Sequence, residues 1–154
     1  MPPLYEAPRA LDFIVSEANG WRSREKVTMR TPLVAATAVI YMPGSLLYPE
    51  GAMTGPPAVL TGNYLAVTTV NELDYANAIL MYPTDTRAGL TEVAVIMRDA
   101  EVNEAYLLYA FALAGGAVFS PAQIVQANAA LLNNRILVRT AVLAESIVAP
   151  SPGP

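Results

Sequence analysis

The sequence predicts a β-rich α+β fold: a small, compact β-sandwich or barrel-like domain with one main helix at about 121–133 and extended arms at both ends. Between residues 31 and 102, short apolar runs alternate with Pro, Gly and Asn at intervals of roughly ten residues, which is typical of compact β domains. One later segment carries helix start and stop signals, and both ends are rich in proline. The 154 residues fit one domain, because domains typically have ~100–200 residues.

The composition predicts that much apolar surface lies against something other than water. Hydrophobic residues make up 54% of the chain and charged residues 14%, whereas average soluble chains have about 25% charged residues. The longest charge-free apolar run, AYLLYAFALAGGAVF, stops after 15 residues, short of the ~20 that a spanning helix needs, so no membrane span is expected. The start, MPPLYEAPRALD, has no basic segment followed by an apolar one, so no signal peptide is expected.

The absence of cysteine and histidine removes many classes of function. Disulfide scaffolds, thiol nucleophiles, imidazole bases and the usual zinc sites are excluded, and we expect no metal or cofactor. Carboxylate chemistry remains, and its densest cluster is Asp99, Glu101 and Glu104. In a strand, however, Asp99 and Glu101 would share one solvated face and alternate with Ala100 and Val102. The sequence therefore favours a protein that is not an enzyme.

The charge pattern argues against nucleic acid as a partner. The net charge is −4, and the nine basic residues are scattered singly, whereas phosphate binding depends on clustered Lys and Arg. Five of the basic residues fall in the first thirty positions, but acidic residues are interleaved with them. Such a nearly neutral segment suits a polar protein surface better than DNA.

The N-terminal elements follow from proline content and a turn signal. Residues 1 to about 12 contain three prolines and predict an extended arm without a core of its own. Phe13 to Ser16 predicts a short strand that runs into an Asn-Gly turn, and the return run REKVTM places Val27 and Met29 on one face. This pattern predicts a hairpin.

The clearest strand is TEVAVIMRD. Its alternation places Val93, Val95 and Met97 on one face and Ala94, Ile96 and Arg98 on the other. The later run RILVR predicts another strand, with Ile136 and Val138 on one face. The ending IVAPSPGP is rich in proline and should not continue a sheet.

The one well-signalled helix has a recognisable start and end. Ser120 is a candidate N-cap, Pro121 suits the first helical position, and Gln123 stands where a capping-box partner reaches back. Asn133-Asn134 ends the helix. The apolar stripe between these signals consists of Ile124, Ala127, Leu131 and Leu132.

Four segments taken together resemble the bacteriophage lambda-type head decoration proteins, also called capsid cement proteins. They are FIVSEANGWRSREKVT, NAILMYPTD, VAVIMRDAEVNEAYL and a helix ending in NNRILVR, and the resemblance spans about residues 13–139. It implies a homotrimeric virion protein, assembled in the host cytoplasm, on the outer surface of the expanded head at threefold and quasi-threefold sites. There it would cement major capsid subunits against the pressure of packaged DNA, with no nucleic acid, membrane or small-molecule substrate as partner.

The resemblance also implies three parts: an N-terminal capsid-binding arm at 1–24, a β-rich decoration domain at 25–139 and a Pro-rich C-terminal extension at 140–154. The arm would order on the capsid and add a strand to a sheet of the major capsid protein. Trp21 would be an apolar anchor on the capsid, or else it would pack in the core of this chain. Arg22 and Arg24 would pair with capsid carboxylates, or else they would lie on a solvated strand face. The expected capsid-binding residues are Leu11, Phe13, Ile14, Val15, Trp21, Arg22 and Arg24.

Three segments exceed the family pattern: an enlarged loop at 43–57, the apolar stretch 105–119 and the tail 140–154. They would form contacts between subunits or enlarge the core. Two other classes stay open. A small-molecule-binding β-barrel, or another oligomeric barrel module, predicts a wide apolar interior, and in the small-molecule case a stable monomer. An enzyme predicts that Asp99, Glu101 or Asp74 converge in a pocket with raised pKa values.

Overall fold

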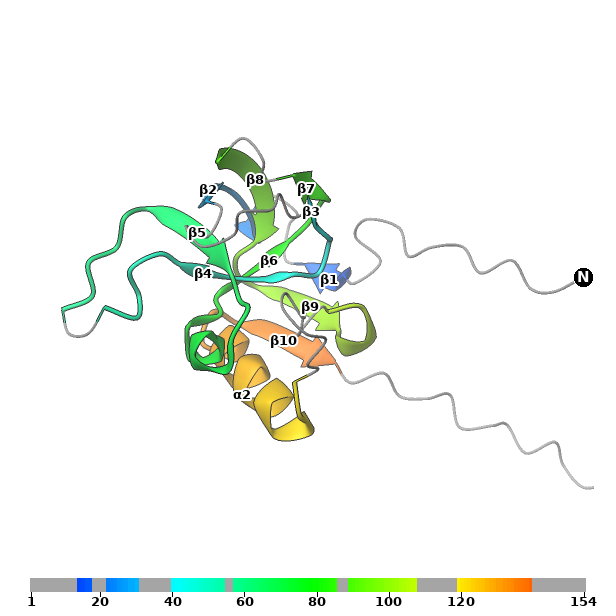
Figure 1. The fold of residues 1–154 in the computed structure, drawn as a ribbon. Coiled ribbons are helices and arrows are strands. Elements are labelled where there is room, and N and C mark those ends of the chain that lie inside the picture. The colour runs from blue at the N-terminus through cyan, green and yellow to red at the C-terminus, as the bar shows by residue number, and fades with distance from the viewer. Residues whose placement is uncertain are drawn as a thin grey trace, which may run out of the picture.

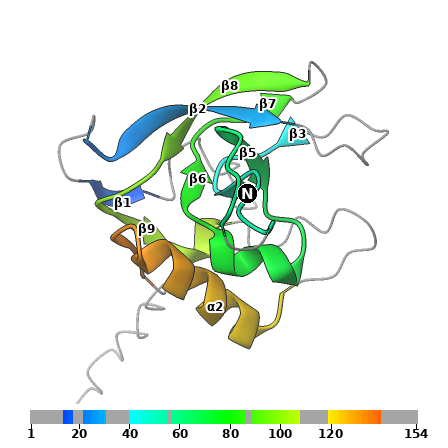
Figure 2. The same ribbon diagram turned by 90° about the vertical axis from the view of Figure 1, so that its left-hand side faces the viewer.

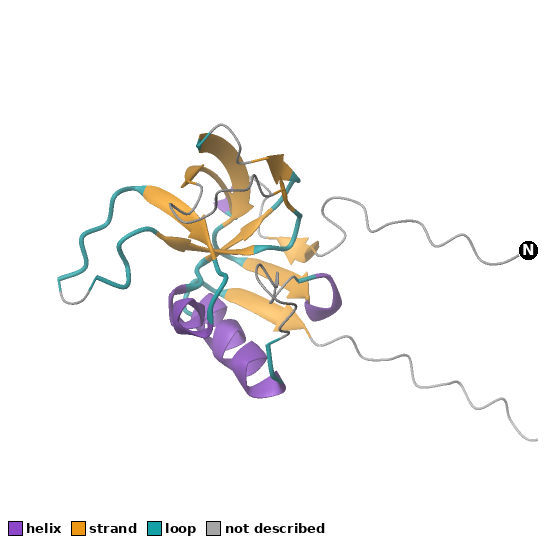
Figure 3. Cartoon of the chain, viewed as in Figure 1, coloured by secondary structure: helices purple, strands orange, loops and turns teal. Residues whose placement is uncertain are grey.

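The computed structural model describes residues 14–17, 22–30, 40–54, 57–85, 89–107 and 119–139. These residues form the β-rich α+β fold expected from the sequence, with a barrel and one main helix (Figures 1 and 3). The strands are β1 Ile14–Glu17, β2 Arg24–Arg30, β3 Ile40–Tyr41, β4 Leu46–Pro49, β5 Asn63–Ala66, β6 Ala78–Leu80, β7 Thr84–Asp85, β8 Leu90–Ile96, β9 Ala100–Asn103 and β10 Ile136–Arg139. The helix is α2 Pro121–Leu132, and the 3-10 turns are η1 Val70–Tyr75 and η3 Glu104–Tyr106. The expected arms at 1–12 and 140–154 lie outside the described residues.

Five strands close into a barrel in the order β2-β5-β4-β6-β8. The pairs are antiparallel except β2 with β5, and β2 pairs with β8 along its full length, from Arg24 opposite Ile96 to Arg30 opposite Leu90. Side chains from all five strands and from Tyr41 pack together inside it, as in other small barrels, whereas a small-molecule-binding barrel would need a wide interior. This cluster contains Met29, Tyr41, Leu47, Ala66, Ala78, Leu80, Val93 and Val95.

A second core lies between the barrel and a layer made of α2, η1 and the sheet β1-β9-β10 (Figure 2). β9 is the central strand of that sheet, antiparallel to β1 and parallel to β10. The second core includes Leu46, Tyr48, Leu73, Ile79, Ile96, Val102, Leu131 and Ile136. The fold therefore stacks one packed layer on one side of the barrel.

β8 contributes to both cores, which confirms the alternation predicted for it. Val93 and Val95 belong to the barrel cluster, with Met97 packed against it, whereas Ile96 belongs to the second core and Ala94 packs against that core. Both faces are apolar because one points into the barrel and the other toward the second layer.

The predicted helix is confirmed, with its capping box. The Ser120 backbone N–H donates to Gln123 Oε1 at 2.7 Å, and the Gln123 backbone N–H donates to Ser120 Oγ at 3.4 Å. The predicted apolar stripe needs one correction. Leu131 is fully buried, but Leu132 is 56% exposed, because neighbouring helix positions point about 100° apart and only one of the two faces the core.

The predicted hairpin between Phe13–Ser16 and REKVTM is wrong. β1 pairs with β9, some 85 residues later in the chain, and β2 pairs with β5 and β8. The prediction that Val27 and Met29 share a face is confirmed, since both belong to or pack against the barrel cluster. The turn signal therefore did not identify the strand partners.

The enlarged loop predicted at 43–57 begins later than expected. Ser45 to Tyr48 are buried, and Leu46–Pro49 forms the barrel strand β4, so this part enlarges the core. The loop lies between β4 and β5, and its described residues, 50–54 and 57–62, project from the body (Figure 1). Of the apolar stretch 105–119, only 105–107 and 119 are described, and Leu107 is buried in the second core.

Candidate interaction surfaces

β1 is an edge strand of the three-stranded sheet and belongs to the predicted arm. Ile14 lies opposite Val102 and Glu17 opposite Ala100, with a register shift between Ile14 and Ser16. Such a bulge re-aims a side chain, and Val15 at this point is 55% exposed. One edge of β1 is bonded to β9, and among the described residues no strand pairs with its other edge.

An ion pair fixes β1 to the start of β2. Glu17 accepts hydrogen bonds from Arg24 Nε at 2.9 Å and from Ser23 Oγ at 2.7 Å, and it also pairs with the Arg24 Nη2 group. The hydrogen bonds from Arg24, in the first place, and from Ser23 hold the pKa of Glu17 below its ordinary value, against the opposing effect of burial. This network attaches the end of β1 to the barrel.

The structure describes four of the seven predicted capsid-binding residues, and these four lie in different surroundings. Ile14 packs against the second core, whereas Val15 is exposed. Arg22 is exposed, and its carbonyl accepts a hydrogen bond from Arg98 Nε at 3.0 Å. Arg24 is already paired with Glu17, so a capsid carboxylate would share or replace that partner. Leu11, Phe13 and Trp21 lie outside the described residues.

The carboxylates that an enzyme would need are engaged in separate pairs. Asp99 pairs with Arg135 and Glu101 with Arg139, while Asp74 accepts from Gln126 Nε2 at 2.7 Å. The Arg139 guanidinium lowers the pKa of Glu101, the opposite of the rise that the enzyme alternative predicted. Within the described ranges no group of acidic residues has the arrangement of a metal site, and no described helix is long and apolar enough to cross a membrane.

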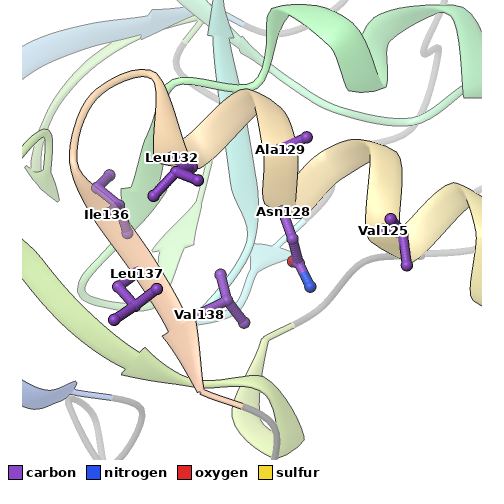
Figure 4. Close-up of a pocket in the computed structure, with 7 residues that line it drawn as sticks. All are labelled: Val125, Asn128, Ala129, Leu132, Ile136, Leu137 and Val138. Carbon is purple, nitrogen blue, oxygen red and sulfur yellow. The ribbon is translucent and has the colours of Figure 1, made fainter.

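A shallow apolar groove of ≈ 260 Å³ lies between α2 and β10 (Figure 4). Its rim carries large exposed side chains: Val125 is 66% exposed, Leu132 56% and Leu137 37%. Asn128 is the polar residue among those that line it. The full lining is Val125, Asn128, Ala129, Leu132, Ile136, Leu137 and Val138.

The described residues of the β4–β5 loop, 50–54 and 57–62, form a second apolar surface. Met53 is 43% exposed, Val59 71% and Leu60 57%. At the base of the loop, Glu50 accepts from Thr61 Oγ1 at 2.6 Å and Asn63 Nδ2 at 3.1 Å, and it pairs with Arg30. The bonds from Thr61 and then Asn63 lower the pKa of Glu50. The loop therefore exposes apolar side chains, while hydrogen bonds and an ion pair of Glu50 fix its base.

The sequence predicts part of the loop, within 43–57, as a possible contact between subunits, but it does not single out Val59 and Leu60 or predict the groove between α2 and β10. For the loop, the available signal was the charge-free stretch between Glu50 and Glu72, which contains MTGPPAVL. For the groove, the signal was the adjacent pair Leu131 and Leu132, of which a single helix face can bury only one.

The comparison with known families decides the assignment. The family model described as bacteriophage lambda head decoration protein D matches residues 3–115. The chain belongs to this family. No curated protein and no solved structure matches the chain.

Membership of the head decoration family makes this chain a structural protein of the phage virion, associated with the capsid. The match contains all of β1 to β9 but ends before α2 and β10, whereas the resemblance in sequence extends to residue 139. The β4–β5 loop therefore lies inside the family region, and the α2–β10 groove lies beyond it.

Proposed function

We propose that this decoration protein binds the outer surface of the expanded head as a homotrimer at threefold and quasi-threefold sites, and cements major capsid subunits against the pressure of packaged DNA. Assembly takes place in the host cytoplasm. The observation that carries the proposal is the family match, which extends from residue 3 and so includes the predicted arm.

In this proposal the segment 1–24 is the capsid-binding arm, 25–139 the decoration domain and 140–154 the C-terminal extension. The contacts of β1 give the arm an anchored root: Ile14 packs on the core, and Glu17 is tied to Arg24. The proposed arm is therefore attached at a fixed point, and Val15 in β1 is exposed to a partner. A strand of the major capsid protein would add at the edge of β1 that is not bonded to β9, through backbone hydrogen bonds.

Three arms on one trimer explain how a small contact could resist internal pressure. Binding of one arm makes the next binding event intramolecular, so that the effective local concentration strengthens the hold without any new contact. Each arm loses conformational entropy when it orders on the capsid. A fixed root at β1 reduces this loss, because fewer residues have to be ordered.

The test is co-sedimentation with expanded, undecorated heads. The full chain is compared with a chain lacking residues 1–12, which leaves the described β1 strand and its pairing with β9 intact. A chain lacking 140–154 is the matched control for loss of a Pro-rich end. We expect the full chain and the control to pellet with heads at a fixed ratio and the chain without 1–12 to stay in the supernatant.

Two results would overturn the proposal. Failure of the full chain to bind heads would remove the cementing function, and equal binding by the chain lacking 1–12 would remove the arm from it. Electron cryomicroscopy of the decorated heads tests where the trimers bind. Protrusions away from the threefold and quasi-threefold positions would contradict the proposed trimer sites.

A further inference from the structure

The sheet β1-β9-β10 has one covered face and one outer face. Ala100, Val102 and Ile136 point into the second core, and Ile14 packs against it. Because side chains alternate along a strand, the residues next to them on β9 and β10 point the other way. The outer face carries Ser16 of β1, Glu101 and Asn103 of β9, and Leu137 and Arg139 of β10.

A row of polar side chains crosses all three strands on this outer face. Ser16 lies opposite Glu101, and Arg139 Nη2 donates to Glu101 Oε1 at 2.7 Å. The bond from Arg139 in the first place, and a hydrogen bond from Ser16, lower the pKa of Glu101. The row ends on β10 in a cation whose side chain is 57% exposed.

Arg139 has donors left for a further acceptor. A guanidinium carries five N–H groups, and among the described residues Glu101 alone accepts from Arg139. Leu137, two residues earlier on the same face of β10, is also exposed. Arginine pairs with carboxylates in a planar, two-bond geometry and is enriched in protein interfaces. This end of the face therefore fits a protein surface that offers a carboxylate beside an apolar side chain.

The position of the outer face relative to β1 indicates which protein supplies that surface. In the proposed function, a capsid strand adds at the edge of β1 that is not bonded to β9 and so continues this sheet. The other face of the sheet is covered by the second core, so further parts of the capsid subunit can reach the sheet only from its outer face. β10 lies two strand spacings from β1, roughly 10 Å, well within an interface of ordinary size.

We propose that the major capsid protein covers the outer face of the sheet β1-β9-β10, with a capsid carboxylate bound to Arg139 and an apolar capsid side chain on Leu137. This inference rests on the proposed function and extends its capsid contact from β1 across the sheet to β10. The family match ends at residue 115, before β10, and so does not assign this contact.

Two substitutions that break the same ion pair test the role of Arg139. Arg139→Gln removes the cation, whereas Glu101→Gln removes the carboxylate and leaves the cation available. Co-sedimentation with expanded, undecorated heads at increasing protein concentration gives the concentration at half-saturation. We expect Arg139→Gln to raise this concentration by about tenfold and Glu101→Gln to leave it unchanged or lower it.

Leu137→Ser tests the apolar part of the contact, and Leu90→Ser is its matched control. Leu90 is an exposed leucine at the start of β8, above the barrel, whereas β10 lies in the layer below it (Figure 1). Leu137→Ser should raise the half-saturation concentration by about fivefold, because part of a leucine side chain is no longer buried on binding. Leu90→Ser should bind heads as the unsubstituted chain does, and thermal unfolding checks that every variant is folded.

Three results would overturn the contact while the proposed function stands. Normal head binding by both Arg139→Gln and Leu137→Ser would show that the capsid does not cover this face. Equal weakening by Arg139→Gln and Glu101→Gln would show that the ion pair matters only for the structure of the sheet. Electron cryomicroscopy of decorated heads that places β10 against a neighbouring copy of this chain would assign the face to contact between copies.

Failure of the proposed function gives a different result. In that case the unsubstituted chain itself does not pellet with heads, and the capsid contact of β10 is refuted together with the cementing function.

Discussion

The backbone of Gly51 lies against the carbonyl group of Val59, so closely that a Cβ atom on Gly51 would overlap that oxygen. Gly51 also has a φ of +92°, a region that side-chain-bearing residues rarely adopt. The two limbs of the β4–β5 loop can therefore approach each other only because residue 51 has no side chain. Gly62, at the other end of the loop, has a φ of +84° but open space where a Cβ would lie.

This difference predicts unequal effects of two matched substitutions. Gly62→Ala should lower the free energy of unfolding by about 1–2 kcal/mol, the cost of a left-handed backbone conformation. Gly51→Ala should cost more than that, because the Val59 backbone must also move. Urea unfolding of both variants measures the difference; equal losses would show that the limbs of the loop do not touch.

The Glu17–Arg24 pair predicts how stability depends on pH. Because the folded-state pKa of Glu17 lies below its ordinary value of 4.5, its contribution is fully present above that value and is lost as the pH falls through the folded pKa. Glu17→Gln should lower the free energy of unfolding at pH 7 by about 1 kcal/mol, a figure that allows for solvent screening of the 40% exposed Arg24 side chain. The gap between parent and variant should shrink in acid.

Glu92→Gln is the control for this experiment. Its partner is Lys26, and both side chains are well exposed, at 64% and 74%, so the substitution should have no measurable effect. A Glu17→Gln variant as stable as this control, or a gap that persists unchanged at pH 3, would show that the pair does not hold β1 to the barrel.

Features encoded within a few residues of each other were predictable from the sequence. The capping box needs only Ser120 and Gln123 three positions apart, and the faces of β8 follow from alternation. In both cases the local pattern also satisfies the tertiary structure, which is why helix bounds and strand faces agree with the prediction.

Partners distant in the chain were not predictable in this way. β1 joins β9, and β9 lies parallel to β10, but a short apolar strand carries no signal that selects one partner over another. The same reason explains the groove. Adjacent leucines at 131 and 132 look alike in sequence, and only the placement of α2 against Ile136 decides which one is buried.

Leu131 and Leu132 are neighbours of the same residue type, so replacing each by alanine compares a buried with an exposed position. Leu131→Ala should lower the free energy of unfolding by about 2–5 kcal/mol, because its side chain is fully buried in the second core. Leu132→Ala should change it by no more than about 0.5 kcal/mol, because its side chain is more than half exposed. Thermal unfolding of both variants checks this; a large stability loss for Leu132→Ala would place it in the core.

Two buried tyrosines give the last prediction. The Tyr41 hydroxyl is buried and has no hydrogen-bond partner among the described residues, whereas the Tyr48 hydroxyl donates to Glu72 Oε1 at 3.1 Å. Tyr41→Phe removes a desolvated polar group and should leave the free energy of unfolding unchanged or raise it, while Tyr48→Phe should lower it by about 1–2 kcal/mol. Urea unfolding at pH 7 compares them with both phenols neutral, since burial raises the pKa of Tyr41 and of Tyr48. A loss for Tyr41→Phe equal to that for Tyr48→Phe would mean that the Tyr41 hydroxyl has a partner outside the described residues.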